Sequence, residues 1–428
     1  MNYSEAIEYL FSLQVFGARP GLESTIHLAG LAGEPQRRLR FIHVAGTNGK
    51  GSTCAILESI YRAAGLRVGL FTSPHLVLFG ERIQVNGQMI PEPHVARFVH
   101  AMKPWLATFT DETHPTFFEV VTVMALMWFA EQRCDVVIWE TGLGGRLDAT
   151  NIVTPLACAI TNIGLDHQQW LGETHDAIAA EKAGIIKPGV PVVTAAEPGR
   201  GLEVVVETAR RNGAPLTVMG SHESPPPIID EAPLALLGEH QRRNATVALG
   251  VVAVLQNALP VAPQAIRHGL ANVSWPGRLQ RVQGQGGGTI LLDGAHNLDG
   301  AQALAATLSR DFAEVPVTLI VGLLADKDWR SFAKTLVPLA ARILVVPVKS
   351  PRGLPPAELA AACRESSCAE SVSTAPSLAA ALTQTADDRL QVITGSLYLV
   401  GEAMELLGLQ ATSGGTSERG LNDYAPKD

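Results

Sequence analysis

Short apolar runs alternate with longer segments of helical periodicity along most of the chain. The runs are rich in β-branched residues and predict strands in the first part of the chain, at 41–44, 67–71, 135–139, 158–162 and 190–194. The longer segments have apolar residues three and four positions apart and predict helices, at 53–64, 117–132, 175–183 and 201–212. This alternation is typical of βαβ units, so we expect an α/β fold with a mainly parallel sheet.

A second series of the same kind begins near residue 280. Its predicted strands are separated by helical segments and lie at 289–293, 317–321, 343–346 and 390–394. We therefore expect two units, one at 1–279 and a smaller α/β unit at 280–410. The remaining residues, 411–428, begin with a run of Ser, Thr and Gly, and we expect a disordered tail there.

Three segments interrupt the alternation. The segment 275–278, Trp-Pro-Gly-Arg, and the run 284–288, Gly-Gln-Gly-Gly-Gly, are typical of a hinge and a linker between domains. The proline-rich stretch 221–233 predicts a surface loop, and the segment 239–255 after it predicts a long helix. The hinge and linker place the boundary between the two units near residue 280.

Composition narrows the class of protein. A chain of 428 residues with 46% hydrophobic and 17% charged residues is a globular protein with more than one core. Its net charge of −8 argues against a general nucleic-acid surface, which requires a basic face. The longest apolar run, at 120–130, is too short for a bilayer and predicts a buried helix. Five Cys without a CxxC pair and no signal-peptide pattern at 1–13 predict a cytoplasmic protein.

The segment 46–53, Gly-Thr-Asn-Gly-Lys-Gly-Ser-Thr, is a glycine-rich turn between a predicted strand and a predicted helix. The N–H groups of such a turn bind phosphate, a lysine adds positive charge, and a following hydroxyl reaches phosphate-bound Mg²⁺. We expect Lys50 and Ser52 to have these roles with a nucleoside triphosphate. The match to the common P-loop is imperfect, because Val44 replaces its first glycine and Gly51 separates Lys50 from Ser52. A tight turn without a ligand is the alternative.

Polar residues also follow two other predicted strands of the first unit, at the edge where parallel sheets bind ligands. Glu140 begins a glycine-rich turn and suits a Mg²⁺ ligand, although a capping or surface carboxylate is the alternative. Asp148 and Asn151 lie in the same turn, where such residues are common in any case. His167, with Asp166 beside it, has the chemistry of a metal ligand, but lone histidines are often structural.

Two further sites have both a functional and a structural interpretation. Lys182 lies near the end of a predicted helix, where a solvated cation stabilises the helix dipole. The turn 293–297, Asp-Gly-Ala-His-Asn, follows a strand of the second unit, and Arg278 precedes the linker. Polar groups on both sides of a hinge indicate a ligand held between two units, whereas the alternative for the turn is ordinary strand-to-helix punctuation.

Together these segments resemble the folylpolyglutamate synthase and dihydrofolate synthase family, a branch of the ATP-dependent Mur-type amide ligases. The resemblance runs from Gly17 to Gly401 and rests on ordered motifs at 46–53, 73–75, 81–82, 116–119, 140–151, 166–167, 181–185, 241–244, 276–278, 293–297, 326–328 and 395–396. Gly51 is characteristic of this branch. The resemblance implies a P-loop Mur-ligase-type central domain with an N-terminal pterin-loop segment, and a smaller Rossmann-like C-terminal domain that ligates glutamate.

The resemblance also implies a reaction. A carboxylate of tetrahydrofolate or dihydropteroate attacks the γ-phosphate of ATP and forms an acyl phosphate. The amine of L-glutamate then displaces phosphate to give an amide, with ADP and phosphate as the other products. The implied partners are small molecules rather than nucleic acid or a membrane, and relatives are usually monomers.

Roles for individual residues follow from the same resemblance. The implied nucleotide-binding residues come from both units and are Thr47, Asn48, Gly49, Lys50, Gly51, Ser52, Thr53, Asn244, Arg278, Asp293 and His296. Ser52, Glu140 and His167 are implied to ligate Mg²⁺, for which two sites are expected. Lys182 matches a lysine that is commonly carbamylated by CO₂, and it forms the expected catalytic set with Lys50 and His167. The implied substrate-binding residues are Ser73, His75, Arg82, Phe117, Asp148 and Ala149.

The chain departs from the family pattern near its start. Relatives usually have Gly-Leu-Glu-Arg there, whereas this chain has Ser24 in place of the arginine. The loss of that cation either changes pterin binding or has no effect, if the arginine only packs locally. The acceptor, dihydropteroate, tetrahydrofolate or both, stays open. So do two other readings, a Mur-type ligase for another carboxylate and amino acid, and a non-catalytic P-loop protein.

Overall fold

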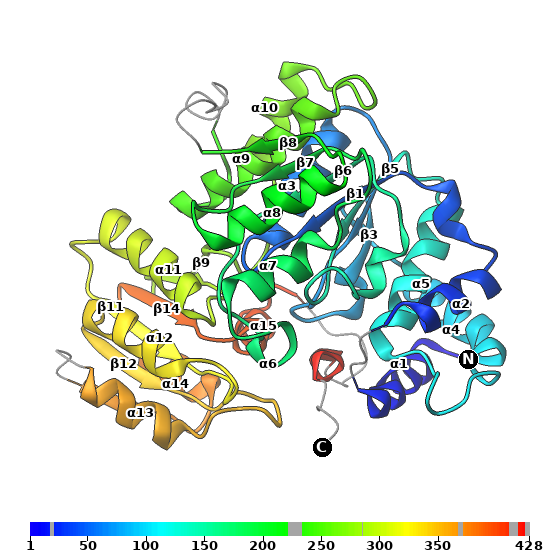
Figure 1. The fold of residues 1–428 in the computed structure, drawn as a ribbon. Helices are drawn as coiled ribbons and strands as arrows, with labels where there is room; N and C mark the ends of the chain where they lie inside the picture. The colour runs from blue at the N-terminus through cyan, green and yellow to red at the C-terminus, as the bar shows by residue number, and fades with distance from the viewer. Residues whose placement is uncertain (18–20, 221–232, 285, 367–370, 411–417, 424–428) are drawn as a thin grey trace.

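The computed structural model describes residues 1–17, 21–220, 233–284, 286–366, 371–410 and 418–423. Within these residues the chain forms two sheets, one of eight strands and one of six, each with helices on both faces (Figure 1). The predicted α/β class is confirmed. The predicted surface loop at 221–233 falls almost entirely outside the described residues.

The eight-stranded sheet has the order β4-β3-β2-β5-β1-β6-β7-β8 and is parallel except where β3 joins β2 and β4. Its strands are β1 (Phe41–Ala45), β2 (Val68–Phe71), β3 (Ile83–Val85), β4 (Gln88–Met89), β5 (Val136–Glu140), β6 (Ala157–Ile160), β7 (Val192–Thr194) and β8 (Leu216–Val218). Its helices are α1 (Tyr3–Ser12), α2 (Glu23–Leu31), α3 (Lys50–Ala63), α4 (Glu92–Leu106), α5 (Phe117–Glu131), α6 (Gln168–Leu171), α7 (His175–Ala183), α8 (Arg200–Arg211), α9 (Glu239–Val254) and α10 (Pro263–Asn272).

The central strands of this sheet are buried on both faces, which explains why they are continuous apolar runs. In β5, Val137 and Trp139 pack with α1, α2, α4 and α5, whereas Val136 and Ile138 pack with α3, α9 and α10. The apolar run at 120–130 lies in α5, a buried helix as predicted. Among the described residues, no helix combines the length and the apolar character needed to cross a membrane.

The six-stranded sheet has the order β13-β12-β11-β14-β10-β9, with only β9 antiparallel to its neighbour. Its strands are β9 (Gln280–Gln283), β10 (Thr289–Leu292), β11 (Val317–Val321), β12 (Arg342–Val345), β13 (Ser371–Thr374) and β14 (Leu390–Thr394). Its helices are α11 (Leu298–Asp311), α12 (Trp329–Leu336), α13 (Pro356–Glu365), α14 (Leu378–Gln384) and α15 (Leu397–Leu406). Short 3₁₀ turns complete the chain, η1 (Leu13–Phe16), η2 (Pro35–Arg38), η3 (Phe79–Arg82), η4 (Ala149–Ile152), η5 (Val337–Leu339) and η6 (Glu418–Asn422).

Two predictions about irregular segments are wrong. The run 284–288 is not a linker between domains, because β9 before it and β10 after it pair in one sheet, and the Gly284 N–H donates to the Gly288 carbonyl at 2.8 Å. Residues 418–423 are not disordered, because η6 is folded and Glu418, Arg419 and Leu421 are buried. The other residues of the expected tail, 411–417 and 424–428, lie outside the described residues. The division into 1–279 and 280–410 stays a prediction, and the second sheet begins at Gln280.

Candidate active site

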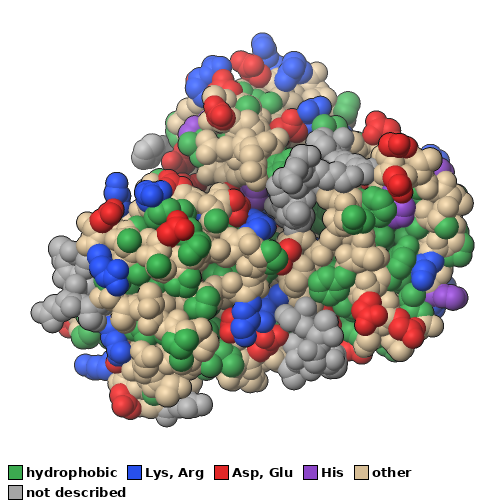
Figure 2. Space-filling model, turned by 90° about the horizontal axis from the view of Figure 1, so that it is seen from below, with side chains coloured by type: hydrophobic (Ala, Val, Ile, Leu, Met, Phe, Trp, Pro, Cys, Tyr) green, Lys and Arg blue, Asp and Glu red, His purple; other side chains and the backbone are tan. Residues whose placement is uncertain are grey.

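A cavity of about 1040 Å³ lies between the two units, against the carboxyl ends of β1, β5 and β6. Seen from below, charged and histidine side chains gather along the line between the two units in Figure 2. All of the predicted site residues line this cavity except two, Thr53 and His75. Residues predicted on separate segments of the sequence are thus brought to one place.

The glycine loop connects β1 to α3 and is held in shape by β6. Asn162 accepts from the Thr47 N–H through its backbone oxygen at 3.1 Å and from the Asn48 N–H through its side chain at 2.8 Å. Gly49 has φ +82° and a Cβ there would lie 2.2 Å from Asn244 Oδ1, so a side chain is excluded. Lys50 Nζ donates to the Gly46 and Thr47 carbonyls at 3.0 and 3.2 Å. The backbone of the loop therefore holds the Lys50 side chain in place.

Gly51, the residue that departs from the common P-loop, has a packing reason. It lies in the first turn of α3, and a Cβ at this position would lie 2.8 Å from the ring atom Cζ2 of Trp275. The absence of a side chain lets the segment 275–278 approach the phosphate loop. Thr53, by contrast, is fully buried behind the loop rather than at the cavity.

Glu140 is a buried carboxylate at the end of β5. Its Oε2 accepts from the Ser73 N–H at 3.2 Å. Burial raises the pKa of Glu140 to about 7, an effect that the charge of Lys50 opposes. A divalent cation would stabilise the ionised form of this desolvated carboxylate, and the Ser52 hydroxyl offers a second hard oxygen ligand at the same cavity. The donor set therefore fits Mg²⁺.

Few protein side chains are available as metal ligands in this cavity. In the part of the chain that the structure describes, no group of three or more His, Cys, Asp and Glu could hold an ion. Mg²⁺ is usually bound by one or two carboxylates together with substrate phosphates and water, so this number of protein ligands is compatible with it. Burial lowers the pKa of His167 to about 3, with Lys327 acting in the same direction. His167 is therefore neutral, the form that ligates metals.

Lys182 is buried, which excludes the interpretation as a solvated surface cation. Its side chain ends against the phosphate loop, where Nζ donates to the Gly46 carbonyl at 2.9 Å. Burial, together with the nearby charge of Lys50, lowers the pKa of Lys182 to about 7. A substantial fraction of this amine is therefore neutral near pH 7.

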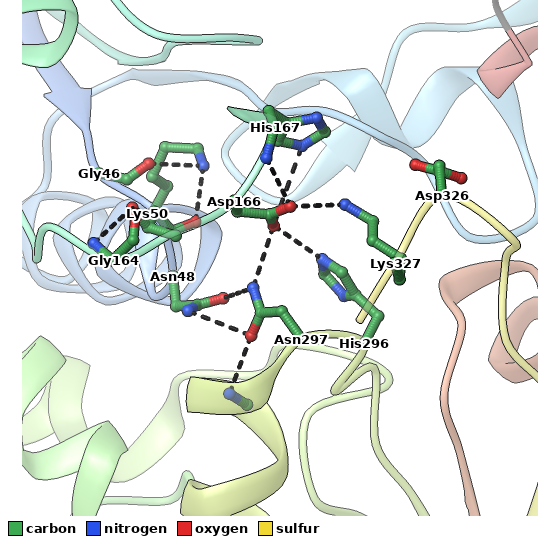
Figure 3. A network of polar contacts seen from close by, with 12 residues as sticks. Gly46, Asn48, Lys50, Gly164, Asp166, His167, His296, Asn297, Asp326 and Lys327 are labelled. Carbon is green, nitrogen blue, oxygen red and sulfur yellow. Dashed lines mark hydrogen bonds and ion pairs between the residues drawn. The ribbon is translucent and has the colours of Figure 1, made fainter. Parts of the chain in front are cut away.

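Asp166 is the centre of a polar network between the two units, shown in Figure 3. It accepts from Lys327 Nζ at 2.7 Å and from Asn297 Nδ2 at 3.0 Å, and His296 Nε2 lies 3.7 Å away. Burial opposes its ionisation, but His296 and Lys327 outweigh burial and hold the pKa of Asp166 well below its ordinary value. Asn48 of the glycine loop and Asn297 exchange amide hydrogen bonds. The second unit is thereby tied to the phosphate loop.

The sequence predicted Asp166 only as a neighbour of the candidate ligand His167, and it placed Lys327 in a motif without a role. The two residues are 161 positions apart and belong to different units, so no local pattern joins them. The only signal in the sequence is that each lies beside a predicted strand end with other polar residues.

Residues at the start of the second unit, and Arg278 just before it, shape the cavity wall. The two carboxylate oxygens of Asp293 accept from the Leu279 and Ala295 N–H groups at 2.9 and 3.0 Å, which fixes the turn after β10. Arg278 is half-buried and donates to the Gly277 carbonyl at 3.1 Å. His296 therefore projects into the cavity from a rigid turn.

The predicted substrate-binding residues divide into two groups. Ser73, Arg82, Phe117 and Ala149 line the cavity, as does Asp148. Asp148 is occupied with its own turn, because it accepts from the Leu143 N–H at 2.8 Å and from the Thr150 N–H at 3.0 Å. It therefore shapes the wall.

His75 and Ser24 lie away from the cavity wall. His75 is buried behind Arg82, whose Nε donates to His75 Nδ1 at 2.8 Å. Ser24, at the position of the missing arginine, donates to the Thr113 carbonyl at 2.8 Å.

Comparison with known proteins identifies the family of the chain. Residues 44–198 match the family model of the Mur ligase middle domain, and residues 277–397 match that of the Mur ligase, glutamate ligase domain. A dihydrofolate synthase/folylpolyglutamate synthase of Bacillus subtilis is 36% identical over 427 residues, covering 95% of this chain and 99% of that protein. A protein of the same description from Escherichia coli is 33% identical and covers 95% and 96%.

Solved structures have the same fold. A folylpolyglutamate synthase of Mycobacterium tuberculosis, complexed with ADP and AMPPCP, has a TM-score of 0.86 at 32% identity and covers 95% of this chain and 99% of its own. An Escherichia coli protein in complex with DHPP and ADP has a TM-score of 0.84 at 31% identity, covering 96% and 98%. The chain belongs to the folylpolyglutamate synthase/dihydrofolate synthase family of the Mur ligases.

Proposed function

We propose that this protein is an ATP-dependent ligase that joins L-glutamate to a folate-type carboxylate, tetrahydrofolate, dihydropteroate or both. Family membership supports the reaction class. The observation that carries the proposal is the single cavity that joins the glycine loop, Lys50, Glu140 and Lys182 of one unit to His296 and Asp293 of the other. A cavity shared in this way has room for a nucleotide and an acceptor side by side.

In this proposal the chain acts by positioning and by neutralising negative charge. The N–H groups at the start of α3 bind the phosphates, and Lys50 exchanges its contacts with the Gly46 and Thr47 carbonyls for the β- and γ-phosphates. The acceptor carboxylate attacks the γ-phosphate in line, and the glutamate amine attacks the resulting acyl phosphate. Arg278, in the segment before β9, and His296 of the second unit would contact the nucleotide, with Asn244 beside Gly49.

Mg²⁺ would be held by Ser52, Glu140 and His167, and when bound it offsets the charge that accumulates on the transferred phosphoryl group. The ionised form of Glu140 is required for this role. Lys50 and Arg278 lie near enough to favour that form against burial. The chain's own residues thus prepare a negative site for the cation.

We also propose that Lys182 is carbamylated. Its neutral amine would attack CO₂, release one proton and become an anion, which would favour a second metal ion. The low pKa of about 7 makes the neutral amine available at neutral pH. The donor bond to the Gly46 carbonyl places the modified group beside the phosphate loop.

Small molecules are the proposed partners, and a cytoplasmic monomer is the proposed state. A net charge of −8 supports the first part, since a nucleic-acid surface requires basic residues. The cysteines at 54, 134, 158 and 363 are buried free thiols, in agreement with a reducing compartment.

A product assay tests the function. The purified protein is incubated with ATP, Mg²⁺ and L-glutamate, and either dihydropteroate or tetrahydrofolate, while ADP and the glutamylated product are measured. We expect product with at least one acceptor and none with Lys50→Ala, whose fold is checked by circular dichroism. ADP release that responds to another carboxylate, but to neither folate acceptor, would contradict the folate assignment.

A further inference from the structure

The C-terminal segment 418–423 crosses back to the opposite end of the chain and closes one side of the cavity. Figure 1 shows this red helical turn, η6, between the two units and near α1. Leu421, Asn422 and Asp423 line the cavity, although they follow every motif of the family resemblance. The acceptor side of the cavity therefore contains residues that no motif predicts.

This segment is bound to both units. The Glu418 carboxylate accepts from the Tyr3 hydroxyl at 3.0 Å and from the Phe79 N–H at 2.6 Å, both in the first unit. At its other end, Asp423 Oδ1 accepts from Ser350 Oγ at 2.7 Å and from the Tyr398 hydroxyl at 2.8 Å, both in the second unit. Contacts at both ends give the segment a defined position.

The segment also determines the protonated nitrogen of His75. A backbone carbonyl only accepts, so His75 Nε2, 2.9 Å from the Glu418 carbonyl, must carry the hydrogen. Burial, followed by the charge of Arg82, lowers the pKa of His75 well below its ordinary value, so the ring is neutral. His75 Nδ1 is therefore an acceptor, and it receives the hydrogen bond from Arg82 Nε at 2.8 Å.

Asn422 holds the other side of Arg82. Its Oδ1 accepts from Arg82 Nη2 at 2.5 Å, and its Nδ2 donates to the His75 carbonyl at 3.0 Å. The side-chain amide of Asn422 therefore holds both the guanidinium of Arg82 and His75, the residue that accepts from Arg82 Nε. Arg82 is oriented by two residues of the tail, one acting through His75 and one directly.

Both hydrogen-bond partners of Arg82 are neutral, and its third close neighbour is the ring of Phe117, 5.3 Å from the guanidinium carbon. Among the described residues, no carboxylate forms an ion pair with it, although Tyr398, Glu81 and Glu140 act on it at longer range. Arg82 is only 3% exposed and lines the cavity. A buried cation without a paired anion is costly, and an anionic ligand in the cavity would offset that cost.

We infer that Glu418 and Asn422 are positioning residues that hold Arg82 as an unpaired cation for an anionic group of the carboxylate acceptor. The inference rests on the proposed function, since it assumes that the acceptor occupies this side of the cavity. The neutral amide of Asn422 is essential to it. A carboxylate at the same position would still accept from Arg82, but it would neutralise Arg82 and would lose the donor to the His75 carbonyl.

Two substitutions separate orientation from charge. Asn422→Ala removes one hydrogen bond of Arg82, and we expect the KM for the acceptor to rise about threefold to fivefold. Asn422→Asp keeps the shape and the oxygen that accepts from Arg82, but it pairs Arg82 with a negative charge and replaces the donor to the His75 carbonyl with an oxygen. We expect a rise of about tenfold or more. The KM for ATP should stay within about twofold of wild type in both variants, because the segment does not touch the phosphate loop.

Asn272→Ala is the matched control. Asn272 also donates its side-chain amide to a backbone carbonyl, that of His268 at 2.8 Å, but on the exposed end of α10. We expect wild-type KM values for it, and thermal unfolding reports any loss of stability in all three variants. A purely structural role of Asn422 predicts that the KM for ATP and the KM for the acceptor rise together and follow the loss of thermal stability in both variants.

The results are interpretable separately for the function and for the inference. If wild-type protein turns over neither folate acceptor, the proposed function fails. If wild type is active, but the acceptor KM of Asn422→Asp does not exceed that of Asn422→Ala, the role of the tail is wrong. An equal rise in the KM values for ATP and acceptor would also overturn it.

Discussion

Lys182 is a buried cation whose ammonium group donates to a backbone carbonyl rather than to a carboxylate. In water its pKa is 10.5, and burial in this cavity, with Lys50 nearby, lowers it to about 7. Such a shift has two consequences. The folded protein is destabilised at every pH at which the Lys182 amine would be protonated in the unfolded chain. In addition, the neutral amine becomes available for chemistry.

The stability consequence is testable with Lys182→Met. Between pH 7 and 10.5 the Lys182 amine is protonated in the unfolded chain but largely neutral in the folded protein. The free energy of unfolding of the wild type is therefore lowered most at pH 7 and below, and this penalty decreases as the pH rises to 10.5. We expect Lys182→Met to raise the free energy of unfolding by on the order of a few kcal/mol at pH 7, and by less as the pH approaches 10. Chemical denaturation in CO₂-free buffer at several pH values measures this, with the exposed Lys334→Met as control. A gain independent of pH would contradict the explanation.

The chemical consequence is testable with Lys182→Ala. If the carbamate supplies an anion beside the phosphate loop, the alanine variant lacks ligase activity and added formate or acetate restores part of it. Activity is followed by ADP release with and without 100 mM-range carboxylate, and Lys50→Ala is the variant that short carboxylates should not rescue. Full activity of Lys182→Ala without additives would exclude the carbamate.

At the scale of the element, the β1–loop–α3 unit depends on glycines for two different reasons. Gly49 needs both a positive φ and free space, because Asn244 of α9 lies against it. Gly51 needs only the space, because Trp275 packs on it. The loop is therefore shaped by contacts from α9 and from the segment before β9.

Gly49→Ala separates backbone strain from crowding when it is compared with Gly65→Ala. Gly65 has φ +87°, close to the +82° of Gly49, but a Cβ at Gly65 has nothing within 4 Å. We expect Gly65→Ala to cost about 1 kcal/mol of stability and to leave nucleotide binding unchanged. Gly49→Ala should cost about 1–2 kcal/mol more and weaken nucleotide binding at least tenfold. Denaturant titration and calorimetry with ADP measure both, and equal effects of the two variants would contradict the crowding by Asn244.

At the scale of the whole molecule, the two units are coupled through Asp166. The side chains of Asp166 and Lys327 are 10% and 8% exposed, so their ion pair is shielded from water. Asn48 and Asn297 continue the same network to the glycine loop, and Asn297 also caps α11 by accepting from the Gly300 N–H at 2.9 Å. The relative position of the two units is therefore coupled, through these hydrogen bonds, to the conformation of the glycine loop.

Asp166→Asn keeps the shape of the side chain but leaves Lys327 without its counter-charge. We expect a loss of about 3 kcal/mol in the free energy of unfolding and a larger radius of gyration in solution scattering, since the units separate more readily. Glu131→Gln is the control, because the Glu131–Arg97 pair is 41% and 51% exposed and should contribute less than about 1 kcal/mol. An unchanged radius with unchanged stability would show that the network does not hold the units together.

Prediction from sequence succeeded where the signal is local. The central strands were found because both faces of the sheet are buried and their apolar runs are continuous, as in β5. The edge strands β4 and β8 were missed, because β4 has two exposed residues and β8 three half-buried ones. The run 284–288 was misinterpreted because a hairpin turn and a flexible linker have the same glycine-rich composition.

By itself the sequence determined the α/β alternation, the glycine loop, and the polar residues that follow its strands, because these depend on periods and spacings of a few residues. Only the tertiary structure decided which of them meet. Lys182 contacts Gly46 across 136 positions, Lys327 pairs with Asp166 across 161, and Asn422 orients Arg82 across 340. Burial and charge at such contacts depend on both partners, so the segment around Lys182 by itself also allowed a solvated surface cation, and the composition of the tail predicted disorder.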